Sequence, residues 1–508
     1  MRRDTLRSWP FPLRLLAALI LGAAWPLAFA PFAWWPLAIA LLFGLFWLVV
    51  TTKRPRQAAV LGYVFGFAAF AAGTSWISIT LHNFAHMNWL LAGGAVALLA
   101  AYCAIYPALA LWLAIRFFRG SARLLALPVL WIFGEWARAR LFTGFPWLAT
   151  GYTQTHAFLG GFAPWLGQYG VGLATASFAA ILVWMFCEST SRRILLGGVS
   201  ALLLLSGVAL AMSSVSFTHP VGQKLRVSLL QGDIPISEKW NDAAVSHILH
   251  HYVQLILQTP PDTQLIVLPE TAFPIFQTEI PNLIDELQAW SAHNHKTLII
   301  GIPEAVGHKY YNAAMEIDGR APLRWYQKEH LVPFGEYIPL PRLLGPLVHH
   351  FLPGLGSFSF GHGPYVLPID QQKAGMTICY EESFSRDVRK GVREGATFLL
   401  NISDYAWYGH SIAAAQSLQM AAMQSLQQQK PDVRATNTGI TALISPHGAV
   451  RSQLPQFVVG TLNGAIQPMA GETPYGRWGS LPYLLLSGLL MVLALGLTRR
   501  QSSSRQSV

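Results

Sequence analysis

Long apolar runs fill the first two-fifths of the chain, and one more lies near its C-terminal end. They cover residues 11–30, 34–50, 57–80, 89–115, 122–141, 160–187, 194–213 and 481–498. A helix that crosses a bilayer needs about 20 apolar residues. The pattern therefore predicts a polytopic α-helical membrane bundle of about eight spans, seven in residues 1–213 and the last at 481–498. The run at 122–141 fits least well, because it contains Pro128, Glu135, Arg138 and Arg140.

Residues 214–480 follow a different pattern, in which short apolar runs alternate with amphipathic ones. Runs typical of strands lie at 225–232, 264–269, 297–302, 312–317, 374–380, 397–403, 440–445 and 457–462. Helical spacing occupies 243–258, 280–294, 384–394 and 410–428. Strands that alternate with helices over a stretch of this length predict an α/β layered domain. Residues 499–508 would form a polar tail.

Composition and charge support this division. The chain is 53% hydrophobic and 12% charged, with a mean hydropathy of +0.38, whereas a soluble domain has about 25% charged residues. Residues 214–480 hold 21 of the 24 acidic residues and 18 of the 35 lysines and arginines, a net charge of −3, which leaves +14 for the rest. The basic excess therefore belongs to the membrane-flanking loops. No basic stripe with interleaved aromatics lies in the domain, so nucleic-acid binding is not predicted.

The basic clusters also predict an orientation. They lie at residues 2–7, 53–56, 116–123, 192–193 and 499–505. All five fall on one side of the membrane if every apolar run is a span, while the opposite loop at 81–88 has no lysine or arginine. Because basic loops remain in the cytoplasm, both termini are predicted to be cytoplasmic and residues 214–480 extracytoplasmic. The first run also resembles a signal peptide, but further spans follow at once, so we expect an uncleaved helix.

Three segments of the domain place a reactive side chain in or just after an apolar, strand-like run. LIVLPE ends at Glu270, WYQKEHLVPFGEY contains Lys328, and KAGMTICYE contains Cys379. A carboxylate can take the thiol proton, and an ammonium can stabilise the oxyanion that forms when the thiolate attacks a carbonyl. The helix expected after the cysteine would lower the thiol pKa. Taken singly, the three residues are better explained as a surface carboxylate, a solvated charge and a small core residue, and their order and setting together favour the catalytic interpretation.

The other cysteines and the histidines indicate neither a disulfide framework nor a metal site. Cys103 and Cys187 lie in apolar runs, and the three cysteines of the chain include no CxxC pair. His247, His250 and His251 share one face of a predicted helix, but no zinc motif surrounds them. We therefore expect these histidines at the surface, and we predict no metal and no cofactor.

Residues 135–154 concentrate aromatic side chains, glycine and proline around Glu135, Arg138 and Arg140. Charges at membrane depth are costly and are usually paired or functional. Alternatively, the two arginines reach the outer interface of the membrane with their long side chains. The sequence leaves both interpretations open.

The order Glu270, Lys328, Cys379 on LPE, YxKxxLVPFGE and ICYE resembles the nitrilase, or carbon–nitrogen hydrolase, superfamily. Longer matching motifs are GFPWL at 144–148, QGDIPISEKW at 231–240, LPETAFP at 268–274, HLVPFGEYIP at 330–339, AWYG at 406–409 and RATNTGIT at 434–441. Together with the apolar runs, these motifs make nearly the whole chain similar to the membrane branch of that superfamily, the apolipoprotein N-acyltransferases.

The resemblance implies a role for each candidate residue. Cys379 would be the nucleophile, Glu270 the general base and Lys328 the oxyanion stabiliser. Glu336 would hold the lysine and the geometry of the site. Residues that would support or line the pocket are Tyr380, Glu381, Trp240 and Trp407.

The resemblance also implies a setting. The domain would be an αββα sandwich on an eight-helix bundle in the bacterial inner membrane, with the site in the periplasm beneath mobile hydrophobic arms. The stretch 340–361 suits such an arm, because it is apolar and rich in glycine and proline. The acyl donor would be a phospholipid, the acceptor a diacylated apolipoprotein, and the protein a monomer.

Three positions depart from the family pattern. This chain reads SDYAWYG where SNDAWFG is common, so Asp404 and Tyr405 replace asparagine and aspartate. Ser417 stands where a histidine is common. These differences bear on the polarity of the pocket and leave Glu270, Lys328 and Cys379 in place.

Two other functions share part of the pattern. A membrane-tethered amidase would use the same three residues to hydrolyse a small amide, but a single anchor would suffice for it. A transporter or receptor would use the domain only to bind a ligand, but charged residues are scarce in the apolar runs. Acyl transfer between two lipid substrates accounts for both the spans and the three reactive residues.

Overall fold

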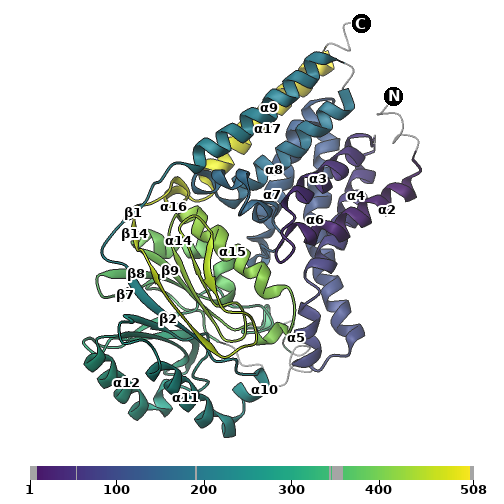
Figure 1. Ribbon diagram of the computed structural model, residues 1–508. Coiled ribbons are helices and arrows are strands. Elements are labelled where there is room, and N and C mark those ends of the chain that lie inside the picture. Colours follow the sequence, from purple (N-terminus) through teal and green to yellow (C-terminus); the bar gives the residue numbers. More distant parts are fainter. Residues whose placement is uncertain (1–8, 53, 189–190, 343–344, 346–357, 504–508) are drawn as a thin grey trace. The chain divides into compact units, whose positions relative to one another are not determined.

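The computed structural model describes residues 9–503 except 53, 189–190, 343–344 and 346–357. The chain divides into two compact units (Figure 1). The first unit comprises residues 1–78, 88–215 and 478–508, and the second comprises residues 79–87 and 216–477. The stretch 340–361, expected to form a mobile arm, lies mostly outside the described residues.

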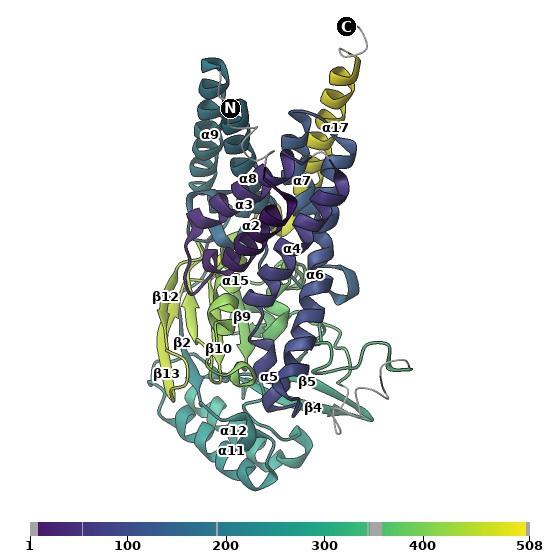
Figure 2. The same cartoon turned by 90° about the vertical axis from the view of Figure 1, so that its right-hand side faces the viewer.

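The first unit is built from helices, and a helix occupies each of the eight apolar runs. Figure 2 shows α4 running beside α6. The helices are α2 (Phe11–Ala24), α3 (Trp35–Val50), α4 (Pro55–Gly73), α6 (Trp89–Phe117), α7 (Ala122–Arg138), α8 (Ala163–Glu188), α9 (Arg192–Ser213) and α17 (Leu481–Ser503). The last helix thus continues into the tail predicted from residue 499.

Not every one of these helices is long and apolar enough to cross a membrane. Five candidate spans are found in the described part of the chain, at 11–28, 89–117, 158–187, 192–213 and 481–501. A sixth is reached if α4 and α5 (Ile77–Asn83), which meet at 54°, are one span. The prediction of about eight is not reached by length and composition, because α3 has only 16 residues and α7 contains Glu135 and Arg138.

The charged residues of α7 are buried and partnered inside the first unit. Both oxygens of Glu135 accept the Thr150 backbone N–H, at 3.1 and 3.0 Å, and Oε1 also accepts the Thr150 hydroxyl at 2.6 Å. Arg138 donates to the Trp147 carbonyl at 2.6 Å, and its guanidinium lies 4.5 Å from the Phe70 ring centroid. Of the two interpretations left open for these charges, pairing therefore holds for Glu135 and Arg138. These bonds tie α7 to the irregular segment that follows it.

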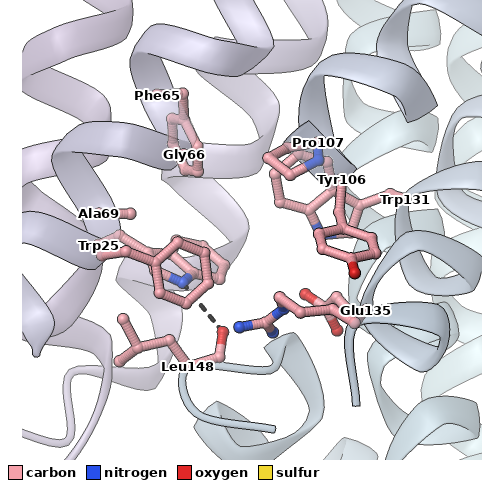
Figure 3. Close-up of a pocket in the computed structure, with 11 residues that line it drawn as sticks. Trp25, Phe65, Gly66, Ala69, Tyr106, Pro107, Trp131, Glu135 and Leu148 are labelled. Carbon is pink, nitrogen blue, oxygen red and sulfur yellow. Dashed lines mark hydrogen bonds between the residues drawn. The ribbon is translucent and has the colours of Figure 1, made fainter. Parts of the chain in front are cut away.

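A cavity of about 30 Å³ lies beside this cluster. Figure 3 shows Tyr106 and Glu135 on one side of the cavity and Trp25 and Leu148 on the other, where the Trp25 indole N–H donates to the Leu148 carbonyl at 3.3 Å. A space of this size accommodates about one water molecule.

The second unit contains two six-stranded sheets and a two-stranded pair. One sheet has the order β12-β11-β10-β9-β8-β7 and the other β13-β2-β3-β4-β5-β6. The first sheet consists of β7 (Val366–Ile369), β8 (Gln372–Ile378), β9 (Phe398–Ser403), β10 (Asp432–Thr436), β11 (Ala442–Ile444) and β12 (Val450–Gln453). The second consists of β2 (Leu225–Gln231), β3 (Leu265–Val267), β4 (Thr297–Val306), β5 (Lys309–Ile317), β6 (Arg324–Gln327) and β13 (Gly460–Ile466), and the pair of β1 (His219–Pro220) and β14 (Met469–Ala470).

The two sheets pack face to face, and the alternation of side chains along each strand explains why. In β3, Leu265 and Val267 join the core between the sheets, whereas Ile266 joins a second core on the outer face. In β9, Leu400 lies in the core between the sheets and Leu399 faces outward. The strands are therefore apolar on both faces, as expected for sheets that are covered by helices.

Helices cover the outer faces. The helices of the second unit are α10 (Ile236–Lys239), α11 (Asp242–Leu257), α12 (Pro281–Asn294), α14 (Ser385–Arg393), α15 (Ala413–Gln428) and α16 (Pro474–Trp478). Both views show α11 and α12 side by side, and their apolar residues join the outer core of the β3 sheet. Helices α14 and α15 contribute apolar residues to clusters on the other sheet. The resulting αββα layers fix the positions of the strand ends and of the residues that follow them.

Candidate active site

The three residues singled out in the sequence follow strands of different sheets. Glu270 comes three residues after β3, and Lys328 comes directly after β6 of the same sheet. Cys379 comes directly after β8 of the other sheet. The predicted strand 374–380 ends earlier than expected, at Ile378, because Cys379 has a φ of +53°. The backbone turns sharply there into a short 3₁₀ helix, Cys379–Ser383, which holds the thiol at the head of the turn.

Lys328 lies between two carboxylates. Its Nζ donates to Glu336 Oε1 at 2.9 Å and to Glu270 Oε1 at 3.3 Å, and the side chain is 1% exposed. Burial by itself lowers a lysine pKa, but the charges of Glu336 and Glu270 outweigh it and raise the pKa of Lys328 well above its usual value. The lysine is therefore a fixed cation beside the thiol.

Glu270 is held from several directions. Oε1 accepts the Asn312 amide at 2.8 Å as well as Lys328, and Oε2 accepts the Asp404 backbone N–H at 3.0 Å. The charge of Glu270 also raises the pKa of the Cys379 thiol, which places the carboxylate close to the thiol. A carboxylate fixed in this way beside a thiol is placed to receive the thiol proton.

The pKa of the partly buried Cys379 thiol is raised above its usual value. Burial is the main cause, the charge of Glu270 raises the pKa further, and the charge of Lys328 only partly opposes them. A lowering of the thiol pKa by the following helix stays a prediction, and desolvation and the adjacent carboxylate dominate the pKa.

Glu336 and Glu381 stabilise the site through the hydrogen bonds that their carboxylates accept. Glu336 Oε2 accepts the Val332 backbone N–H at 2.8 Å, and Oε1 accepts Asn312 at 2.7 Å in addition to Lys328. Glu381 is fully buried and accepts four hydrogen bonds, from the backbone N–H groups of residues 329, 330 and 378 and from the Tyr326 hydroxyl. Burial raises its pKa to about 6 in spite of these donors. Glu381 thereby links the segment after β6 to the turn that carries Cys379.

The three aromatic candidates lie in different surroundings. The Tyr380 ring packs edge-on against His330 and Phe384, with centroids 5.7 and 4.8 Å away. The Trp407 ring packs edge-on against Phe84 at 5.0 Å, and the Trp407 carbonyl accepts the Thr80 hydroxyl at 2.8 Å.

Trp240 differs from the other aromatic candidates because it is 55% exposed, at the end of α10. The role of Trp240 stays a prediction.

Of the residues predicted from the sequence, the structure brings Glu270, Lys328, Glu336 and Cys379 together, and these four are called the grouped residues below.

Sequence reasoning missed Asn312 and Lys239. Asn312 donates to both glutamates, and its signal in the sequence is a single amide directly before the apolar residues 313–315 of β5. Lys239 is 1% exposed and donates to the Glu270 carbonyl at 3.1 Å. It lies next to Trp240 in a matching motif, but an isolated lysine in a sequence gives no sign of burial.

Two of the departures from the family pattern contact each other. The Tyr405 hydroxyl donates to Ser417 Oγ in a short hydrogen bond, and Ser417 also accepts Arg434 Nη2 at 3.0 Å. Arg434 is fully buried and forms an ion pair with Glu382, in the turn after Cys379. Tyr405, Ser417 and Arg434 therefore form one hydrogen-bonded group.

The part of the chain that the structure describes contains no group of three or more histidine, cysteine, aspartate or glutamate side chains that could hold a metal ion. His247 and His250 are exposed, and His251 lies 3.2 Å from the Gly232 carbonyl.

Gly301 allows Glu270 to occupy its position. A Cβ on this residue of β4 would lie 2.1 Å from the Pro269 carbonyl oxygen and 2.8 Å from the Glu270 Cα. We expect Gly301→Ala to displace Glu270 and to lower the acylation rate at least about tenfold, since misplacing a catalytic group by about 1 Å costs up to about 100-fold. Acylation followed by mass spectrometry on the purified full-length protein measures this.

Gly460→Ala is the matched control for Gly301→Ala. Gly460 is also a strand glycine of the same sheet, but its added Cβ would meet only Leu454 at 3.4 Å, an ordinary contact. This variant should acylate at the wild-type rate. Equal rates in both variants would contradict the role given to the close approach at Gly301.

The fold and the site define a carbon–nitrogen hydrolase domain, with a glutamate, a lysine and a cysteine on the ends of two packed sheets. The carbon-nitrogen hydrolase family profile matches residues 226–475. The profile described as the apolipoprotein N-acyltransferase N-terminal domain matches residues 21–181. Nit3 of Saccharomyces cerevisiae, a solved member of the nitrilase superfamily, aligns with 49% of this chain and 92% of its own at 17% identity and a TM-score of 0.38.

Full-length relatives narrow the class further. The apolipoprotein N-acyltransferase of Methylococcus capsulatus is 37% identical over 97% of this chain and 98% of its own length. That of Nitrosomonas europaea is 38% identical over 94% of this chain and 96% of its own. The chain belongs to the apolipoprotein N-acyltransferase family and is an acyltransferase that acts in lipoprotein maturation.

Proposed function

We propose that residues 214–480 form the catalytic domain and move an acyl chain from a phospholipid, through a thioester on Cys379, to the α-amine of the N-terminal diacylglyceryl-cysteine of an apolipoprotein. The observation that supports this proposal is the grouping of Cys379, Glu270 and Lys328: the buried Lys328 ammonium lies 3.3 Å from the Glu270 carboxylate, and the charges of both act on the thiol. This grouping is a nucleophile with its base and its electrophilic partner already in place.

In the first half-reaction, Glu270 takes the Cys379 proton while the sulfur attacks the ester carbonyl of the phospholipid. Lys328 and nearby backbone N–H groups stabilise the oxyanion. When the tetrahedral intermediate collapses, the carbon–oxygen bond breaks, and Glu270 returns the proton to the departing lysophospholipid oxygen. The products are an acyl thioester on Cys379 and a lysophospholipid.

In the second half-reaction, the free amine of the lipoprotein attacks the thioester carbonyl. Glu270 takes a proton from the attacking amine and delivers it to the departing sulfur, which restores the thiol. Glu336 and Asn312 keep Lys328 and Glu270 in position through both steps, since Glu336 accepts from Lys328 and Asn312 donates to both Glu336 and Glu270. Tyr380, Glu381, Trp240 and Trp407 would support or line the substrate pocket.

Apolar surface next to the site supports lipid substrates. Phe334 is 47% exposed and lies between Lys328 and Glu336 in the chain. Phe360 is 48% exposed, and the next residue, Gly361, donates its N–H to the Lys328 carbonyl at 2.9 Å. Exposed aromatic residues beside a reactive centre fit a partner with an apolar surface.

The membrane setting is part of the proposal. Residues 1–213 would contribute seven spans and residues 481–498 the eighth, in the bacterial inner membrane. Both termini and the tail at 499–508 would be cytoplasmic, and the catalytic domain periplasmic. The basic clusters flanking the apolar runs support this orientation. We propose a monomer, because one chain supplies all the grouped residues.

The competition between amine and water tests the proposal. We expect the acyl-enzyme made from phospholipid to be stable in buffer and to be discharged at least about 100-fold faster by a diacylated lipopeptide with a free N-terminal amine, because a site shielded from water favours the amine. The control is the same lipopeptide with its amine acetylated, which should leave the adduct intact. Equal discharge by water and by the amine would support a hydrolase instead.

A further inference from the structure

Lys239 is a charged side chain with no role in the mechanism above, yet it is buried behind the catalytic base. Its ammonium forms an ion pair with the Asp404 carboxylate, and the two side chains are 1% and 3% exposed. A buried lysine persists as a cation only where it is paired and hydrogen-bonded. Its second partner is the backbone carbonyl of Glu270, at 3.1 Å.

Asp404 reaches the same glutamate from the other end. Its backbone N–H donates to Glu270 Oε2 at 3.0 Å. Its carboxylate accepts the Ala406 backbone N–H at 2.9 Å and the Asn437 amide at 3.2 Å. The ion pair therefore holds Glu270 at both its backbone and its carboxylate.

Asn437 connects this pair to the segment in front of α10. Its amide donates to the Ile234 carbonyl at 2.8 Å, and its carbonyl oxygen accepts the Ile234 backbone N–H at 3.0 Å. Asn437 is fully buried. Lys239, Asp404 and Glu270 thus belong to one closed network that joins α10 to the ends of β3, β9 and β10.

We infer that Lys239 and Asp404 form a positioning pair for Glu270, which fixes the direction of its carboxylate and keeps the charge behind it balanced. The inference rests on the proposed role of Glu270 as the base. The pair is neutral as a whole, so the charges that face Glu270 in the reacting site are those of Lys328, Glu336 and Cys379. Tyr405 and Tyr408 also interact with Cys379 and Glu270 through their charges when ionised, but the pKa of each phenol is raised well above its usual value by burial, so both remain neutral.

The charge at position 404 is a feature of this chain, since asparagine is common there in the family pattern. Asp404→Asn removes the charge and keeps the size, the backbone N–H to Glu270 and an oxygen that accepts from Lys239. Lys239→Met removes the other charge and keeps a chain of similar length. The two substitutions therefore leave opposite charges unpaired behind Glu270.

The test is the pH dependence of acyl-enzyme formation by the full-length protein with phospholipid, followed by intact mass. We expect Asp404→Asn to move the acid limb of the rate profile to lower pH by about one unit, since an unpaired cation close to a carboxylate favours the ionised form. We expect Lys239→Met to move it to higher pH and to lower the plateau rate at least about tenfold. The double variant should return the limb to the wild-type position.

If Lys239 and Asp404 only stabilised the fold, Asp404→Asn and Lys239→Met would not move the acid limb of the rate profile in opposite directions. Acid limbs at the same pH in the wild type and in Asp404→Asn would overturn the inference. Because Asp404→Asn is nearly isosteric, this comparison can still be made if Lys239→Met does not fold. Glu270→Gln in the same assay separates this outcome from failure of the proposed function. If that variant still forms acyl-enzyme at the wild-type rate, the base is misassigned, whereas an inactive Glu270→Gln with unmoved limbs rejects only the positioning pair.

Discussion

Cys379→Ala should form no acyl-enzyme when the purified protein is mixed with phospholipid, whereas the wild type gains the mass of one fatty acyl group. The thiol is the only nucleophile among the four grouped side chains whose attack gives a thioester, and the charge of Glu270 acts directly on it. Cys379→Ser should also be inactive, since an alcohol is much harder for a carboxylate to deprotonate than a thiol. Intact mass spectrometry measures both.

The control for this prediction is Cys187→Ala, at the end of α8. Cys187 is partly buried in the first unit and follows no strand of the catalytic domain. This variant should gain the same mass as the wild type, and all three variants should keep the wild-type thermal unfolding midpoint to within a few degrees. An adduct of normal size on Cys379→Ala would remove the covalent mechanism.

Lys328→Met should lose acyl-enzyme formation by about 100- to 1,000-fold, the usual cost of removing one oxyanion donor. A second effect adds to this loss. Without the ammonium, Glu270 and Glu336 remain as two buried carboxylates joined only by Asn312. Repulsion between two neighbouring negative charges favours protonation of one of the two carboxylates. Glu270 would then be unable to act as the base over part of the pH range. Single-turnover acylation at several pH values measures both effects.

Lys390→Met is the matched control for Lys328→Met. Lys390 is also paired with carboxylates, at 2.6 Å from Glu329 and 3.3 Å from Asp387, but it is 28% exposed and contacts neither Glu270 nor Glu336. Its removal should leave acylation within about twofold, because exposed ion pairs contribute little. Breaking the buried pairs of Lys328 should also cost about 3–5 kcal/mol of stability. If Lys328→Met acylates normally, the lysine is structural.

The three residues that depart from the family pattern show that a sequence comparison does not reveal which departures contact each other. Tyr405 and Ser417 each depart from the common pattern, and only the structure shows that they contact each other beside Arg434. Asp404 also departs from it, and its buried partner Lys239 explains why a charge is tolerated there. Departures that look independent along the chain are coupled when their side chains meet.

The apolar periodicity by itself determined most elements of this protein. Each of the eight apolar runs contains a helix, and strands such as β2 and β9 fall within a residue or two of their predicted bounds. Short or polar strands were missed: β10 contains Asp432 and Arg434, and β12 is half exposed. These strands form because adjacent strands supply their hydrogen bonds and packed elements shield them from solvent. The local sequence contains no signal for either.

The sequence also determined the reactive residue types and their order, because the chemistry of acyl transfer demands a thiol, a base and a cation, and the family motifs carry all three. Only the tertiary structure decided how they act on one another. The buried cation between Glu270 and Glu336, the raised thiol pKa and the ion pair behind the base depend on distances and burial between segments far apart in the chain. Electrostatic energies follow separation in space and exposure to water, and neither is written in the order of residues.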